Sequence, residues 1–212
     1  MNFCTNCGGR VGNEFFYCKY CGKPLRKKGD QSGSVKETEK DSKENDITLV
    51  EEKKEIQSDL EKANEYKKNG DYENAITYYS MFLSFHPDNC EAWENKGFVL
   101  SLLGKYKEAI NCFDKALELN PQVPELVLLN KGNSLINLKK YKEAILCFNS
   151  ALDKDPNISH AWYSKTIAYI NLKMPDRALI CCEKALEIEP DHAEALKLKE
   201  EISKKVKEKE NS

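Results

Sequence analysis

A spacing of 34 or 35 residues recurs along most of this 212-residue chain. Prolines mark it most clearly, at Pro87, Pro121, Pro156 and Pro190, so successive ones lie 34, 35 and 34 residues apart. Two further series keep these steps: Ala75, Ala109, Ala144 and Ala178, and Phe82, Ala116, Ala151 and Ala185. Periods of this length are typical of solenoids built from repeated supersecondary units. The sequence therefore predicts four stacked units.

Each unit is predicted to contain two helices. In the second unit Trp93, Gly97 and Leu100 recur at the three- and four-residue spacing of one helical face, and Gly104 interrupts the pattern. A second apolar stripe follows and consists of Ala109, Ile110, Phe113, Ala116 and Leu117. It ends before Pro121, because proline disfavours helix in the residue that precedes it. The small residues Gly97 and Ala109 predict a close approach of the two helices.

The repeated residues resemble the tetratricopeptide repeat, which Trp93, Gly97, Tyr106, Ala109, Phe113, Ala116 and Pro121 match in the second unit. The resemblance implies an all-α fold, a right-handed α-solenoid of four helical hairpins that holds a partner protein. The fourth unit departs from the pattern at Thr166, at Cys182 where an aromatic residue is usual, and at Pro175 where tyrosine is usual. We expect Pro175 in the first turn of its helix, where the missing N–H costs nothing.

The predicted domain order is as follows: a zinc ribbon over 1–25, a flexible charged linker over 26–55, repeats over 56–89, 90–124, 125–158 and 159–192, and a capping helix over 193–208. In the last segment Ala195, Leu198, Ile202 and Val206 form one apolar stripe among lysines and glutamates, and Asp191 is the expected N-cap. Such a helix is expected to shield the end of the array from solvent.

The resemblance implies that the first helix of each pair lines a concave groove for a peptide or helix of the partner. The candidate groove residues are Asn64, Lys67, Glu94, Asn95, Phe98, Leu126, Leu129, Asn130, Asn133, His160, Tyr163 and Ile167. Family members that grip Glu-Glu-Val-Asp tails use two asparagines and three basic residues. Asn64 and Asn95 match, but Leu60, Leu126 and Asn130 stand at the basic positions. We therefore expect an apolar partner segment; the alternative is that some of these residues pack against neighbouring helices.

A cysteine cluster precedes the repeats. Cys4 and Cys7, and Cys18 and Cys21, form two pairs whose two-residue gaps let four thiolates converge tetrahedrally on one ion. The segment resembles a short zinc ribbon, and one structural Zn²⁺ is expected, with iron or disulfides as the alternatives. So short a domain is expected to unfold when the metal leaves.

The ribbon region is also the basic part of the chain, with six Lys/Arg against one Glu in residues 1–29. These charges and the nearby aromatic residues suit phosphates and bases. The alternative function is thus a nucleic-acid-associated factor whose ribbon binds nucleic acid while the repeats recruit proteins. Residues 26–55 are polar and nearly without apolar side chains, which predicts a flexible tether.

Composition and motifs limit the location and the activity that are expected of the chain. No apolar run approaches the roughly 20 residues of a membrane helix, the N-terminus lacks a signal-peptide pattern, and nine cysteines is an odd number. A reducing, cytoplasmic location is expected. Cys112, Cys147 and Cys181 recur with the repeat and are interpreted as small core residues. With three histidines and no phosphate-binding glycine loop, no enzymatic activity is expected.

Overall fold

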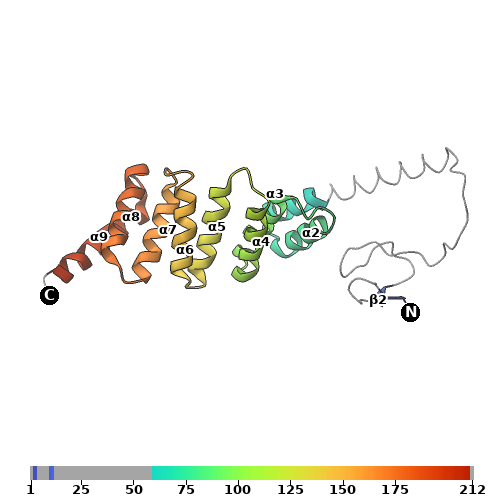
Figure 1. The fold of residues 1–212 in the computed structure, drawn as a ribbon, viewed down its shortest axis with the longest axis horizontal. Coiled ribbons are helices and arrows are strands. Elements are labelled where there is room, and N and C mark those ends of the chain that lie inside the picture. Colours follow the sequence, from blue (N-terminus) through green and yellow to red (C-terminus); the bar gives the residue numbers. More distant parts are fainter. Residues whose placement is uncertain (1, 4–9, 12–58, 211–212) are drawn as a thin grey trace, which may run out of the picture. The chain divides into compact units, whose positions relative to one another are not determined.

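A computed structural model describes residues 2–3, 10–11 and 59–210 of the chain, with side chains for residues 59–206 (Figure 1). The chain divides into two compact units, Met1–Asp88 and Asn89–Ser212. From residue 59 onward every described element is a helix, which confirms the predicted helical repeat fold for this part of the chain.

Among its described residues, the first unit contains two short strands and one helical pair. β1 (Asn2–Phe3) pairs antiparallel with β2 (Arg10–Val11). A helix over residues 59–69 and α2 (Tyr72–Phe85) are joined by a turn at Gly70, which has a φ of 80°. The Tyr79 hydroxyl donates a 2.6 Å hydrogen bond to Asn64 Oδ1 and so joins the two helices.

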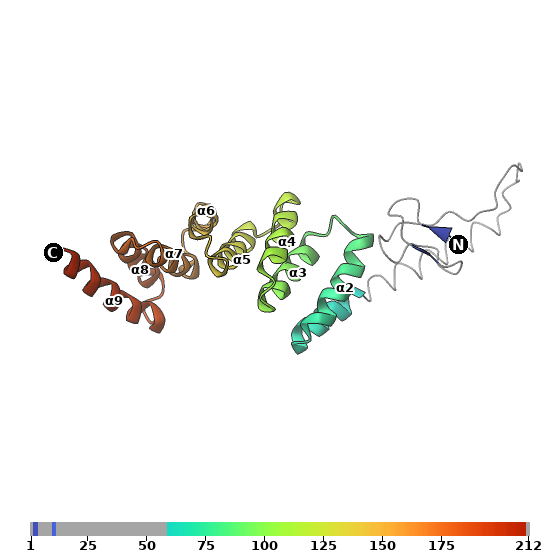
Figure 2. The same ribbon diagram turned by 90° about the horizontal axis from the view of Figure 1, so that it is seen from below.

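The second unit is a run of antiparallel helices (Figures 1 and 2). In order they are α3 (Cys90–Leu102), α4 (Tyr106–Glu118), α5 (Pro124–Asn137), α6 (Tyr141–Leu152), α7 (Ser159–Asn171), α8 (Pro175–Ile188) and α9 (Ala193–Glu210). Each helix contacts the next along the chain. In addition α3 contacts α5 and α5 contacts α7, whereas the second helices α4, α6 and α8 make fewer contacts with one another. The first helices therefore form the more closely packed layer, as expected for the inner side of a curved array.

The hairpins close around a contact between a small and a large residue. A Cβ atom added at Gly97 would lie 2.8 Å from Cε1 of Phe113, and one added at Gly132 would overlap the ring of Phe148. Both rings are fully buried. Glycine is thus required because the backbone of the first helix lies directly against an aromatic ring of the second. The predicted close approach at Gly97 is confirmed, and the ring that Gly97 faces was not predicted.

The fourth hairpin has different residues at both positions of this pair. Thr166 stands at the repeat position of Gly97 and Gly132, and Cys182 stands at the position of Phe113 and Phe148. Both residues are fully buried. A larger residue has replaced the glycine of the first helix and a smaller one has replaced the aromatic ring of the second, so the two departures offset each other in part. Pro175 is the first residue of α8, which confirms the expected first-turn position.

The turn after each of the helices α3, α5 and α7 places one residue at positive φ: Gly104 at 73°, Lys139 at 60° and Lys173 at 58°.

At the start of α9 the Ala195 N–H donates to Nδ1 of His192 at 3.4 Å, and the Leu196 N–H donates to the carbonyl oxygen of His192. His192 therefore caps α9, and the expectation of Asp191 as the cap was wrong.

Replacing Gly132 by alanine tests the close approach. Alanine favours helix by about 1 kcal/mol, but the new methyl group overpacks the Phe148 ring, which typically costs about 1–3 kcal/mol. We expect Gly132→Ala to lower the urea midpoint of the chain. The double variant Gly132→Ala/Phe148→Leu is expected to unfold at a higher midpoint than additive losses give, because the smaller side chain relieves the overlap. A stabilised single variant would contradict the packing.

Candidate partner-binding face

The candidate groove residues of the first unit lie on the helix over residues 59–69. Asn64 is half-buried, and its Oδ1 accepts the hydrogen bond from Tyr79, whose side chain is fully buried. Lys67 is half-buried one helical turn later. The hydrogen bond orients the Asn64 carboxamide, leaving its amino group as the remaining donor.

On α3 the candidate residues divide into half-buried polar and exposed apolar side chains. Glu94 and Asn95 are half-buried, and Phe98 is 40% exposed. Leu102, one turn beyond Phe98, is 50% exposed. Sequence analysis missed Leu102, although its spacing of four from Phe98 placed it on the same helical face.

On α5 the candidates differ in how far they reach solvent. Leu126 is 45% exposed, whereas Leu129 packs against a core cluster formed by Leu135, Ala144, Cys147 and Phe148. Asn130 and Asn133 are half-buried, and the carbonyl oxygen of Asn133 accepts from Nδ2 of Asn137 at 2.9 Å. Leu129 is thus partly a core residue, which matches the alternative that some candidates pack against neighbouring helices.

On α7 the candidates meet the last helix. The ring of Tyr163 lies 4.7 Å from that of His192 and packs against a cluster that includes Ala195 and Ile202 of α9. Burial is the main cause that raises the pKa of Tyr163, and the nearby Glu194 carboxylate adds to it. His160 is exposed, with its ring 6.0 Å from His192, and Ile167 is half-buried. The docking of α9 therefore covers part of the predicted face at Tyr163.

A pair of serines links the first helices of the second and third hairpins. Ser101 Oγ and Ser134 Oγ lie 2.9 Å apart, and each is also 3.0 Å from a carbonyl oxygen of its own helix, Gly97 and Asn130 respectively. Ser134 is almost fully buried. This link holds α3 beside α5 near the C-terminal ends of both helices, within one turn of Phe98 and Leu102 along α3.

The helices α3, α5 and α7 each carry a single lysine, at the same repeat position, and each of these lysines is engaged. Lys131 forms an ion pair with Asp114 of the preceding hairpin. Lys96 lies 5.4 Å from the ring centroid of Trp93, and Lys165 lies 4.7 Å from that of Trp162. These lysines are therefore held against neighbouring side chains of the array.

The repeat position of these lysines continues into α9, which therefore resembles the first helix of a partial fifth repeat. Lys199 lies 34 residues after Lys165 and forms a 3.1 Å ion pair with Glu183 of α8. Glu183 in turn occupies the repeat position of Asp114, the partner of Lys131. In the third hairpin Asn149 stands at this position, so Lys165 has no carboxylate there and instead contacts its own Trp162.

The helical cysteines are packing residues. Cys112, Cys147 and Cys181 are buried, which confirms their interpretation as core residues. Cys182, which follows Cys181 in the sequence, is fully buried as well. Burial raises the pKa of all four thiols. A raised pKa keeps them as thiols at neutral pH and lowers their reactivity.

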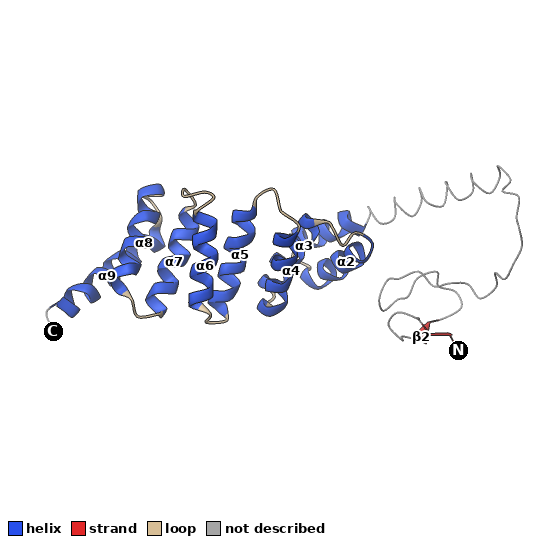
Figure 3. Cartoon of the chain, viewed as in Figure 1, coloured by secondary structure: helices blue, strands red, loops and turns tan. Residues whose placement is uncertain are grey.

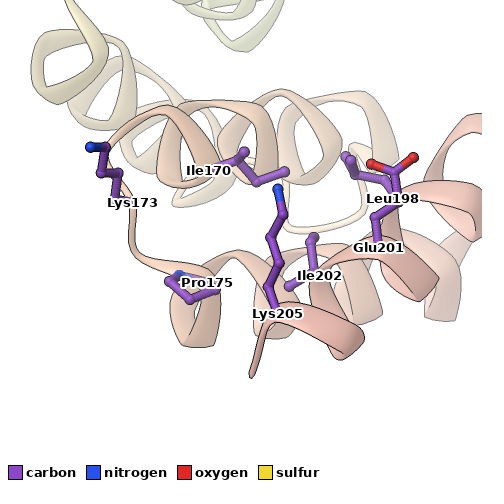
Figure 4. Close-up of a pocket in the computed structure, with 7 residues that line it drawn as sticks. All are labelled: Ile170, Lys173, Pro175, Leu198, Glu201, Ile202 and Lys205. Atoms are coloured by element: carbon purple, nitrogen blue, oxygen red, sulfur yellow. The ribbon is translucent and has the colours of Figure 1, made fainter. Parts of the chain in front are cut away.

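A cavity of about 310 Å³ lies between α7, the α7–α8 turn and α9 (Figure 4). Its apolar lining consists of Ile170, Pro175, Leu198 and Ile202, and its charged lining consists of Lys173, Glu201 and Lys205. Ile170 continues the α7 series of His160, Tyr163 and Ile167 at spacings of three and four.

The predicted zinc ligands Cys4, Cys7, Cys18 and Cys21 lie outside the described residues. Within the part of the chain that the structure describes, no group of three or more His, Cys, Asp or Glu is arranged to hold a metal ion. In the same residues no helix is long and apolar enough to cross a bilayer.

Comparison with known families identifies the repeats. Two models described as tetratricopeptide repeat match the chain, one at residues 90–123 and 126–158, the other at 60–88 and 159–192. Together these matches cover more than half of the chain. The chain is a tetratricopeptide repeat protein.

Solved structures show the same repeat fold. MamA of Desulfovibrio magneticus (residues 41 to the end) matches with a TM-score of 0.61 and 21% identity, over 70% of this chain and 93% of that one. The first tetratricopeptide domain of human RPAP3 matches with a TM-score of 0.55 and 28% identity, over 59% and 98%. The first tetratricopeptide domain of Spaghetti (RPAP3), bound to the HSP90 peptide SRMEEVD, matches with a TM-score of 0.53 and 26% identity, over 55% and 92%.

A curated relative matches a shorter segment. The uncharacterised protein MJ0572 of Methanocaldococcus jannaschii is 40% identical over 48 residues, which are 23% of this tetratricopeptide repeat chain. The match spans 56% of that protein's own length.

The repeated ion pairs Lys131–Asp114 and Lys199–Glu183 predict that a carboxylate at Asn149, the equivalent position of the third hairpin, stabilises the chain. Asn149→Asp places a carboxylate at the position that Asp114 and Glu183 occupy opposite Lys131 and Lys199. We expect a gain of up to about 1 kcal/mol in the free energy of unfolding, the usual limit for exposed ion pairs, measured by urea unfolding at low salt. The gain is expected to vanish in the Lys165→Gln background; a gain that persists there would show that Lys165 is not the partner.

Proposed function

We propose that the protein is a non-catalytic interaction scaffold that holds an apolar segment of a partner protein on the layer of first helices. The observation that carries this proposal is the group of exposed apolar side chains Phe98, Leu102 and Leu126 on the contacting helices α3 and α5. Exposed apolar groups gathered on adjacent elements are typical of interaction sites. An amphipathic helix or extended peptide would bury them.

The charges of this face determine which charges the partner segment is expected to carry. The lysines of α3, α5 and α7 are engaged with Trp93, Asp114 and Trp162, as described above, and these helices contain no arginine. Acidic residues are present instead, at Glu91 and Glu94 on α3. A free carboxylate terminus would find little compensating charge here, whereas a lysine or arginine beside the apolar residues of the partner would be favoured.

The Spaghetti structure supports peptide binding by this repeat fold but differs in the peptide that we propose. Its peptide, SRMEEVD, ends in acidic residues and a carboxylate. In this chain Leu126 and Asn130 stand where the resemblance expects basic residues for such a tail. We infer the same use of the inner helices with an apolar rather than an acidic ligand.

We infer further that Cys4, Cys7, Cys18 and Cys21 hold one structural Zn²⁺. Two Cys-x-x-Cys pairs form the donor set of closed tetrathiolate zinc sites, which leave no position for a substrate. The metal would stabilise a second small module at the N-terminus, and the proposal rests on residue spacing alone.

Exchanging apolar for charged side chains tests the binding face. We expect Phe98→Asp/Leu126→Asp to abolish partner capture from cell extract, because burying a carboxylate in an apolar contact costs several kcal/mol. The matched control is Leu146→Asp/Ile180→Asp, two residues of the second helices that are 65% and 60% exposed. Affinity purification with quantitative mass spectrometry gives the captured partners.

Two outcomes would contradict the proposed face. Loss of capture in the Leu146/Ile180 variant, with capture retained in the Phe98/Leu126 variant, would move the site to the second helices. Tight binding of the SRMEEVD peptide, removed by Phe98→Asp/Leu126→Asp, would show that this face accepts an acidic tail.

Metal analysis tests the zinc proposal. We expect about one Zn²⁺ per native chain, as one tetrathiolate site requires, and no stoichiometric zinc in the Cys7→Ser variant. Cys90→Ser is the control, since Cys90 lies on α3 and its thiol donates to the Ala116 carbonyl oxygen, a bond that serine can also make. Equal zinc content in the wild type and the Cys7→Ser chain would exclude the site.

A further inference from the structure

The turns between first and second helices form one edge of the second unit. Figure 3 shows the α5–α6 turn at the lower edge, opposite the α4–α5 and α6–α7 loops at the upper edge. We call the lower side the basic edge and define it by Lys105, Lys107, Lys139, Lys140, Lys142 and Lys173, which are all exposed. On the opposite side the most acidic segment is residues 187–194, with four carboxylates and no Lys or Arg, whereas the α4–α5 loop over residues 119–123 carries no charge.

Two lysines of the basic edge occupy a backbone conformation that favours glycine. The turn position that holds Gly104 after α3 holds Lys139 after α5 and Lys173 after α7, at φ values of 60° and 58°. A left-handed conformation is unfavourable for a residue with a Cβ atom, and such residues cluster at functional sites. Lysine side chains are thus present at this edge at positions where local backbone geometry alone would favour glycine.

The cavity between α7 and α9 opens at this edge. Lys173 belongs to the α7–α8 turn, and Lys205 lies near the C-terminal end of α9. In Figure 4 Lys173 and Glu201 lie on opposite sides of the lining, with Ile170 and Lys205 between them. Among the described residues neither lysine ammonium has an ion-pair partner, and the floor consists of Ile170, Pro175, Leu198 and Ile202.

The size and chemistry of this cavity select the occupant. About 310 Å³ is at the lower end of the range of ligand pockets, roughly 300–1,000 Å³, and suits one or two apolar side chains. Along the edge the six lysines outnumber the carboxylates of Glu108, Glu143 and Asp176, and one of the lysines, Lys140, pairs with Glu143. In the cavity lining Lys173 and Lys205 outnumber Glu201. Charge complementarity therefore calls for carboxylates on either side of the apolar group.

We propose that the basic edge is a second docking surface, which binds an acidic segment of a partner protein and anchors one apolar side chain of it in the α7–α9 cavity. The cavity of this surface lies between α7 and α9, apart from the groove residues of α3 and α5, although Leu102 at the end of α3 borders the edge near Lys105. The two surfaces take ligands of opposite charge preference. The scaffold would then hold two different segments, an apolar one on the first helices and an acidic one along the turns.

Fluorescence anisotropy with a designed peptide tests the proposal on the full chain. The probe is a fluorescein-labelled nonapeptide with a central leucine and four alternating Asp and Glu residues on each side. Its control replaces the leucine by serine at unchanged charge. We expect the leucine peptide to bind, the serine peptide to bind several-fold more weakly, and both affinities to fall as salt screens the charges.

Matched variants locate the site. In Lys173→Gly/Lys205→Gln the glycine suits the left-handed turn position, so folding is expected to be kept while two charges are lost. We expect this variant to bind the leucine peptide about tenfold more weakly. Lys154→Gln/Lys184→Gln, which removes two charges at the opposite edge, and Phe98→Asp/Leu126→Asp are expected to bind as the wild type does.

Several results would overturn the proposal. They are no binding of the leucine peptide at low salt, equal binding of the leucine and serine peptides, or an unchanged affinity in Lys173→Gly/Lys205→Gln. Tighter binding of poly-uridine RNA or of phosphatidylserine vesicles than of the leucine peptide, also lost in that variant, would assign the edge to a nucleic acid or a membrane instead.

Discussion

The close approach of the two helices inside a hairpin determines much of this structure. In the second and third hairpins, Gly97 against Phe113 and Gly132 against Phe148 bring the helices close enough to bury both stripes of apolar residues. In the fourth hairpin Thr166 and Cys182 occupy these two positions, and both are fully buried. The array therefore continues without a break through a unit that departs from the family pattern, with a residue of intermediate size on each helix in place of the glycine and the aromatic ring.

Stacking of the hairpins then decides which surface is open to a partner. The first helices contact one another, and the Ser101–Ser134 link and the Lys131–Asp114 ion pair fix neighbouring units in register. α9 repeats this arrangement through Lys199 and Glu183. It ends the array as half a repeat and covers the Tyr163 side of α7. Among the first helices α3, α5 and α7, the exposed large apolar side chains are therefore those of α3 and α5, namely Phe98, Leu102 and Leu126.

Sequence reasoning succeeded where the residue type alone sets the structure. The period, the close approach at Gly97, Pro175 in a first turn and the buried Cys112 follow from spacing and side-chain size. The alternative that some groove candidates pack against neighbouring helices did not single out Leu129 and Tyr163, because their packing depends on how the next helix docks. The His192 cap was missed because Asp is the commoner capping residue, and the α7–α9 cavity has no signature in the order of residues.

Hydroxyl-radical footprinting of the chain with and without its captured partner tests most directly whether the first helices bind that partner. The account predicts that oxidation of Phe98, Leu102 and Leu126 falls when the partner binds, since these side chains are exposed in the free chain. Oxidation of Leu146 and Ile180, which are exposed on the second helices, is predicted to stay unchanged. Protection of Leu146 and Ile180 with Phe98 and Leu126 still fully reactive would contradict it.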